Sequence, residues 1–151
     1  MKRRTFIMGL GSATAWPVGA RAQQGDRVRR IGVLMNGIAT ERSFRSYLTA
    51  FLEGLRQVGW IEGQNIRTDV RWNAGDADLA RSYAAQLIGL MPDVILADAT
   101  LNLTVVQQAT FTLPVVFVQV SDPVAQGFVA SLTRPGGQYH RIFAVRVLNR
   151  R

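Results

Sequence analysis

Three short apolar runs restrict the folds that this chain can adopt. They are Ile31–Met35, Val94–Ala97 and Val115–Val120, and the turn-forming pair Asn36-Gly37 closes the first of them. A continuous apolar run of this length is typical of a strand that is buried on both faces, as in a parallel sheet covered by helices. These runs therefore predict the inner strands of such a sheet.

The segments between these runs have helical or strand periodicity. Apolar residues recur at a spacing of three and four over residues 41–58, which predicts an amphipathic helix that Gly59 ends. Alternation over residues 65–72 predicts a further strand. More helices are predicted over residues 79–90, 101–110 and 124–132. This alternating order predicts an α/β fold with a doubly wound parallel sheet.

Residues 1–22 have the features of an export signal. Lys2-Arg3-Arg4 is a charged start, a mildly apolar stretch follows, and Ala20-Arg21-Ala22 fits a cleavage site. The stretch is too short and too interrupted by glycine to span a membrane. Residues 3–7 resemble the twin-arginine export motif, and an ordinary secretory signal is the alternative. We therefore expect a soluble periplasmic protein that starts near Gln23.

The net charge of +8 suggests a nucleic-acid-binding function, but the excess of positive charge lies at the two ends of the chain. Residues 1–22 and residues 138–151 carry the whole excess, whereas arginines and acids balance over residues 23–137. The predicted folded body therefore has no basic face that could follow phosphates. The chain has no cysteine, so disulfides, thiolate metal sites and a lipidated cysteine are excluded.

Motifs of enzymes and cofactor-binding proteins are missing from the sequence. Neither a dinucleotide-binding glycine pattern nor a P-loop occurs, and no serine lies in a nucleophile elbow. His140 is the single histidine, which excludes a histidine metal cluster. Asp76 and Asp78 suit an acid/base pair, but they precede a helical pattern and are more typical of a helix cap. We predict no catalytic residues, no cofactor and no metal.

The candidate ligand-binding residues follow the predicted strands. They are Asn36, Gly37, Thr100, Ser121 and Asp122, because ligands of doubly wound sheets bind outside the carboxyl ends of the strands. Each residue also has a structural alternative. Asn36 and Gly37 are typical of a turn. Thr100 is typical of a helix cap, and a capped helix start also offers free N–H groups to an anion. Ser121 and Asp122 are typical of a cap on the final helix.

Trp60 and Trp72 lie beside the second predicted strand. An indole ring in either position suits stacking on a ligand, but we expect both to fill the rim of the core.

Six sequence blocks follow one another in the chain: Arg30–Met35, Gly59–Ile66, Ala74–Asp78, Pro92–Ala97, Pro114–Val124 and Gly127–Gly137. Together they closely resemble the ABC-transporter substrate-binding proteins whose relatives include tryptophan-binding importer components. The resemblance covers about Arg29 to Gly137, and the Val-Ser-Asp-Pro-Val block that ends at Val124 is fairly specific. Asp98 and Leu101 depart from the residues that the family usually has in this loop.

This resemblance implies a type I periplasmic-binding fold, with two α/β lobes that close around a small molecule such as an amino acid. It implies that residues 23–137 form the first lobe and that Asn36, Thr100 and Ser121 supply contacts from this lobe. An ABC permease in the inner membrane is the implied partner, and no nucleic acid is expected. The alternatives from other classes are a stand-alone flavodoxin-like or receiver-like signalling domain and an exported α/β hydrolase.

Residues 138–151 depart from the family, which usually continues as Asn-Ile-Thr-Gly-Phe into the second lobe. One set of codons that would encode the segment Gln138–Phe143 is CAA TAT CAC CGG ATT TTC, and without its first base this set reads as Asn-Ile-Thr-Gly-Phe. We therefore expect a frameshift near codon 138, an aberrant basic tail and a chain truncated to its first lobe. A single lobe would bind ligand weakly or not at all, because it cannot enclose the ligand.

Overall fold

A computed structural model describes residues 27–129, 131 and 142–144 of the chain. The predicted export signal and most of the predicted aberrant tail lie outside these residues. In chain order the elements are β1 (Arg29–Met35), α1 (Arg42–Gln57), β2 (Ile66–Trp72), α2 (Ala77–Gly89), β3 (Val94–Asp98), α3 (Ala99–Ala109), β4 (Val115–Val118) and β5 (Ile142–Ala144). The predicted alternation of strands and helices is confirmed from β1 to β4.

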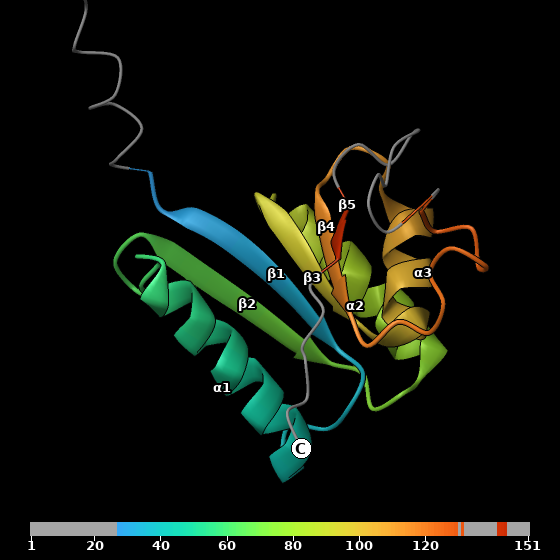
Figure 1. Cartoon of the computed structure of the whole chain (residues 1–151), viewed down its shortest axis with the longest axis horizontal. Helices are drawn as coiled ribbons and strands as arrows, with labels where there is room; N and C mark the ends of the chain where they lie inside the picture. Colours follow the sequence, from blue (N-terminus) through green and yellow to red (C-terminus); the bar gives the residue numbers. More distant parts are fainter. Residues whose placement is uncertain (1–26, 130, 132–141, 145–151) are drawn as a thin grey trace, which may run out of the picture.

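All the strands pair in parallel, in the order β2-β1-β3-β4-β5. In the register, Val33 of β1 lies between Val70 of β2 and Leu96 of β3. Figure 1 shows α1 on one face of the sheet and α2 and α3 on the other. The predicted doubly wound α/β fold is therefore correct. The sequence did not predict β5, which pairs with β4 at the edge of the sheet.

The two faces of the sheet are covered to different extents. The core beneath α2 and α3 contains fully buried aliphatic side chains from the sheet and from both helices, such as Leu34, Leu87 and Leu103. On the other face α1 packs only partly buried residues, Phe44, Leu48, Phe51 and Leu55, against β1 and β2. The α1 face is consequently the more open one, and it leaves apolar side chains of β3 and β4 uncovered by a helix of the described chain.

The predicted helix over residues 124–132 is wrong for the residues that the structure describes. Residues 123–127 form a turn, in which the amide of Phe128 donates to the carbonyl of Pro123 at 2.9 Å. Gly127 has a φ of 75°, a left-handed conformation that ends the turn. Phe128 and Val129 are then buried in the core beside α2 and α3. The apolar spacing that indicated a helix therefore reflects burial of a loop.

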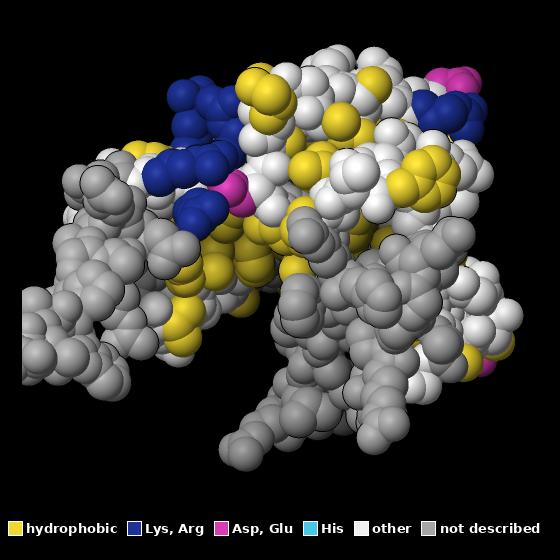
Figure 2. All heavy atoms as spheres, turned by 90° about the horizontal axis from the view of Figure 1, so that it is seen from above, with side chains coloured by type: hydrophobic (Ala, Val, Ile, Leu, Met, Phe, Trp, Pro, Cys, Tyr) yellow, Lys and Arg dark blue, Asp and Glu magenta, His cyan; other side chains and the backbone are white. Residues whose placement is uncertain are grey.

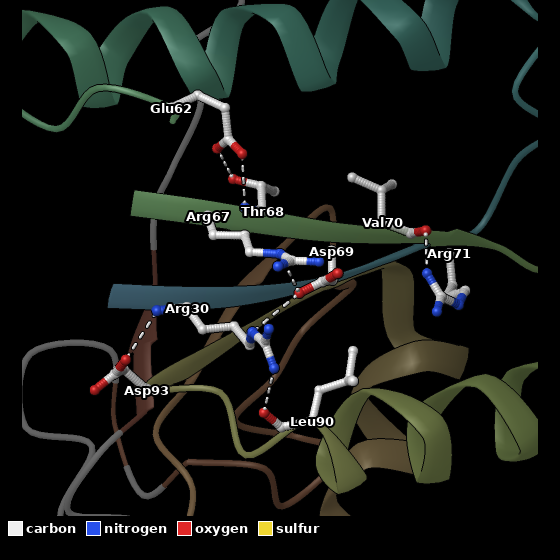
Figure 3. Close-up of polar contacts among 9 residues, drawn as sticks. All are labelled: Arg30, Glu62, Arg67, Thr68, Asp69, Val70, Arg71, Leu90 and Asp93. Carbon is white, nitrogen blue, oxygen red and sulfur yellow. Dashed lines mark hydrogen bonds and ion pairs between the residues drawn. The ribbon is translucent and has the colours of Figure 1, made fainter. Parts of the chain in front are cut away.

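Arg30 connects three elements near the amino ends of the strands (Figure 3). Its backbone amide donates to Asp93 at 2.8 Å, its Nη1 donates to the carbonyl of Leu90 at 2.8 Å, and its Nε lies 3.3 Å from Asp69 Oδ2. Figure 2 shows a group of arginine side chains with an acidic side chain among them, next to an apolar hollow. Arg27 and Arg29 pair with Asp93, so a carboxylate compensates part of the positive charge at this end of the sheet.

None of the helices in the described part of the chain is long and apolar enough to cross a membrane.

Candidate ligand site at the carboxyl edge of the sheet

The carboxyl ends of β1, β3 and β4 lie side by side because these strands are parallel neighbours. The chain passes from β1 to β2 on one side and then to β3 on the other side of β1. This reversal places the topological switch point between β1 and β3, where doubly wound sheets leave a crevice for ligands. Asn36 follows β1 at this point and Asp98 ends β3.

Asp98 is a buried carboxylate, with only 1% of its surface exposed. The backbone N–H of Asn36 donates to Asp98 Oδ2 at 3.2 Å. Neither Asp98 Oδ1 nor the side-chain Oδ1 of Asn36 has a hydrogen-bond partner among the described residues, although both atoms are buried. Burial raises the pKa of Asp98, against a lowering effect of the Asn36 hydrogen bond. The two strand ends thus present two hydrogen-bond acceptors without donors.

Two buried asparagines hold the loops at this edge. Asn102 of α3 donates to the carbonyl of Leu34 at 3.0 Å, and its Oδ1 accepts a hydrogen bond from Asn73. Asn73 Oδ1 accepts from the amide of Gly75 at 3.0 Å, while its own amide donates to the carbonyl of Met35 at 3.1 Å. These bonds tie the ends of β1 and β2 to α3. A rigid edge of this kind positions ligand contacts.

Sequence reasoning did not identify Asn73, Asn102 or Asp98 as site residues. The available signal was the polar residue Asn102 between Leu101 and Leu103 in an apolar helical pattern. Buried polar side chains need partners, so this position pointed to a local hydrogen-bond network.

Gly37 supports the loop through its small size. A Cβ atom at this position would lie 2.1 Å from Cδ2 of Phe44, because the aromatic ring at the start of α1 packs directly over the glycine. Its carbonyl accepts from the amide of Ala74 at 3.0 Å. Gly37 thus allows the loops after β1 and β2 to approach each other.

The prediction that Thr100 caps a helix is wrong. Helix α3 begins at Ala99 directly after β3, and its N-cap residue is Asp98, whose side chain makes no capping hydrogen bond. Thr100 therefore lies inside the first turn and is half-buried. The strand runs one residue further than predicted, which leaves no room for a cap at Thr100.

Ser121 and Asp122 lie in the exposed loop after β4. Asp122 Oδ1 accepts from the amide of Ala125 at 3.0 Å, and the carbonyl of Ser121 accepts from the side chain of Gln126 at 2.6 Å. Asp122 thus caps a single turn, in place of the predicted helix. The fold brings both residues to the same edge as Asn36, with β3 between β1 and β4.

The expectation that one of the two acids before α2 is a helix cap is confirmed. Asp76 Oδ1 accepts from the amides of Asp78 and Leu79, both at 2.8 Å. Asp78 instead pairs with Arg81 on the exposed surface. Among the tryptophans, Trp72 packs against the core on the α1 side, as expected. Trp60 is 39% exposed and borders a small surface pocket near the end of α1.

A cleft of about 560 Å³ runs between α1 and the uncovered part of the sheet and reaches Asp98. Ligand pockets of proteins have volumes in this range and combine an apolar lining with few polar groups. Asp98 is the one carboxylate among the described residues that line the cleft. The lining consists of Met35, Tyr47, Leu48, Ala50, Phe51, Gly54, Leu55, Leu96, Asp98, Val116, Val118 and Gln119.

The described residues contain no group of three or more His, Cys, Asp or Glu side chains that could hold a metal ion.

The strand order is the one that flavodoxin-like folds use, so the topology is also compatible with a receiver-like domain. A receiver needs an acidic cluster near its first strand, however, and the residue there is Asn36. Asp98 occupies the end of the third strand, but it is buried.

Comparison with known proteins distinguishes between these possibilities. The family described as "ABC transporter substrate binding protein" matches residues 33–139. A tyrosine-binding protein of Clostridioides difficile (strain R20291) is 32% identical over 87 residues, which are 58% of this chain and 25% of that protein.

Three solved structures share the fold. A conserved domain protein from Vibrio cholerae has a TM-score of 0.70 at 28% identity. A ligand-free, open substrate-binding protein with adhesive properties from Clostridium difficile has a TM-score of 0.68 at 27% identity. An ABC domain in complex with L-Trp from Streptococcus pneumonia has a TM-score of 0.68 at 25% identity. Each match covers 78% of this chain and 38% of the solved chain, so this chain spans well under half the length of those proteins.

Proposed function

Because the chain belongs to the ABC transporter substrate-binding protein family, we propose that it captures a small amino-acid-like ligand for an ABC importer. The observation that carries this proposal is the apolar cleft that reaches the carboxyl ends of β1, β3 and β4. A relative named as tyrosine-binding and a fold neighbour in complex with L-Trp support an aromatic amino acid as the first class to test. The family is a class of binding proteins, which supports a role without catalysis.

We further propose that Asn36, Thr100, Ser121 and Asp122 contact the ligand from this side, with Gly37 shaping the loop. Their placement at the ends of neighbouring parallel strands supports this assignment. Asn36 has the strongest support, because its side-chain oxygen is buried without a partner next to the cleft residue Asp98. Ser121 and Asp122 would contact the ligand from the exposed loop after β4, and Thr100 would contact it from the first turn of α3.

The proposed partner is an ABC permease of the inner membrane, and the proposed location is the periplasm. ABC substrate-binding proteins are typically extracellular or periplasmic. The charged start and the small-residue cleavage pattern within residues 1–22 support export of this chain.

The test is a nuclear magnetic resonance titration of the full chain with L-tyrosine and L-tryptophan. We expect weak binding, because no helix of the described chain covers β3 and β4 on the α1 face, which leaves the cleft open. The amide signals of Asn36, Asp98 and Ser121 should shift in a saturable manner, whereas a hexose of similar size should leave them unchanged. If no amino acid shifts these signals, or if all shifts lie away from the carboxyl edge, the proposed function is wrong.

A further inference from the structure

We propose that Asp98 binds a protonated amine of the ligand, so that the cleft selects molecules that join an ammonium group to an apolar body. This inference rests on the proposed function and adds the chemical group that the site recognises. It assigns a specificity-determining role to a residue at the end of β3 that sequence reasoning did not place in the site.

The hydrogen bonds around Asp98 indicate that a donor is needed there. Its Oδ2 accepts one bond, from the backbone N–H of Asn36 at 3.2 Å. Its Oδ1 and the Oδ1 of Asn36 accept none from the described residues and are buried. Buried acceptors without donors cost free energy. An ammonium group supplies three N–H donors and a positive charge, so it carries enough donors for the free oxygen of Asp98 and for a second acceptor.

The charge of the site favours an ammonium over other donors. Burial raises the pKa of Asp98, and no arginine forms an ion pair with this carboxylate among the described residues. A bound cation would compensate the buried negative charge, whereas a neutral hydroxyl or amide donor would not. A metal ion is a poorer fit, because the described residues hold no cluster of three ligating side chains.

The walls of the cleft define the rest of the ligand. Leu96, Val116 and Val118 from the sheet face Phe51 and Leu55 from α1 across the cleft. An apolar or aromatic body can lie on these side chains while its amine reaches Asp98 at the strand end. The site would therefore reject purely polar molecules and apolar acids that lack an amine.

The experiment compares three related ligands on the full chain: L-tyrosine, tyramine and 3-(4-hydroxyphenyl)propionate, which lacks the amine. Affinities are measured from the chemical shifts of cleft amides. We expect tyrosine and tyramine to bind at least about tenfold more tightly than the propionate. This comparison uses the unaltered protein, so its outcome does not depend on the folding of a variant.

Two variants test whether Asp98 causes the preference for ligands that carry an amine. Asp98→Asn keeps the size of the side chain but removes the charge, and it should weaken tyramine binding at least about tenfold while propionate binding stays the same or improves. Asp78→Asn, the same chemical change at an exposed carboxylate of α2 that does not line the cleft, should leave the ratio of the two affinities unchanged. Amide spectra of each variant check that the fold is retained.

The outcomes separate this inference from the proposed function. Equal binding of tyramine and the propionate by the unaltered chain would overturn the role of Asp98 and leave the proposed function standing. An unchanged affinity ratio in Asp98→Asn would overturn it as well. If none of the three ligands, nor L-tryptophan, binds at the cleft, the proposed function itself is wrong.

Discussion

At the scale of single residues, Gly37 shows how one missing side chain shapes the candidate site. An added Cβ would lie 2.1 Å from Phe44 Cδ2, so either the aromatic ring or the loop after β1 must move. We expect Gly37→Ala to lower the free energy of unfolding by about 1–3 kcal/mol, as overpacked cores usually do. Urea denaturation followed by circular dichroism measures this change.

Gly54 is the matched control for this substitution. It lies within α1, and a Cβ added there meets no heavy atom within 4 Å. Because alanine favours the helix over glycine, Gly54→Ala should raise the free energy of unfolding by about 0.5–1 kcal/mol. Opposite signs for the two variants are expected. A neutral or stabilising Gly37→Ala would contradict the tight packing of Phe44 on the loop.

At the scale of secondary-structure elements, the start of α2 depends on one carboxylate. Asp76 accepts hydrogen bonds from two amides of the first turn, and Asp78 makes only an exposed ion pair with Arg81. We expect Asp76→Ala to lower the free energy of unfolding by about 1 kcal/mol. Asp78→Ala should cost about 0–1 kcal/mol and less than Asp76→Ala. Thermal denaturation of both variants gives the comparison, and a larger loss for Asp78→Ala would refute this account of the cap.

Elements with strong periodicity could be predicted from the sequence, whereas short segments fixed by tertiary contacts could not. The helix over residues 41–58 and the strand over residues 65–72 agree with α1 and β2 within a few residues. Their patterns follow directly from which face is buried. The loop around Gly127 had helical apolar spacing, but its apolar residues are buried without a helix. β5 has three residues, too few for a pattern.

The placement of Asn36, Ser121 and Asp122 at the carboxyl edge of the sheet could be predicted from the sequence, but the chemistry of that edge could not. The carboxyl edge of the sheet and Asn36 follow from the strand order that the apolar runs indicate. The role proposed for Asp98 depends on which side of β3 it faces, on the approach of the Asn36 amide and on the lack of a second donor among the described residues. These are features of packing across strands that are distant in the sequence, and a single sequence does not contain them.

At the scale of the whole molecule, two buried or half-buried carboxylates act in opposite directions on stability. Burial raises the pKa of Asp98, so the folded chain holds a proton there that the unfolded chain releases above about pH 4. Burial also acts to raise the pKa of Asp93, but hydrogen bonds from Arg30 and Arg29 and the charges of Arg27 and Arg29 outweigh it and lower that pKa. Asp93 therefore stabilises the fold when it is ionised.

The free energy of unfolding should therefore be largest at mildly acidic pH. It should fall as the pH rises from about 4 through the pKa of folded Asp98, and fall as the pH drops below about 4 through the pKa of folded Asp93. Urea denaturation across the pH range measures the fall on each side of pH 4, which we call the upper limb and the acid limb of the pH profile.

Asp98→Asn should flatten the upper limb and stabilise the chain at neutral pH. Asp93→Asn should destabilise the chain at neutral pH and flatten the acid limb. Glu53→Gln, in an exposed ion pair of α1, should change neither limb appreciably. A chain whose stability rises steadily to neutral pH, and an Asp98→Asn variant that follows the same curve, would show that Asp98 is not destabilised by its burial.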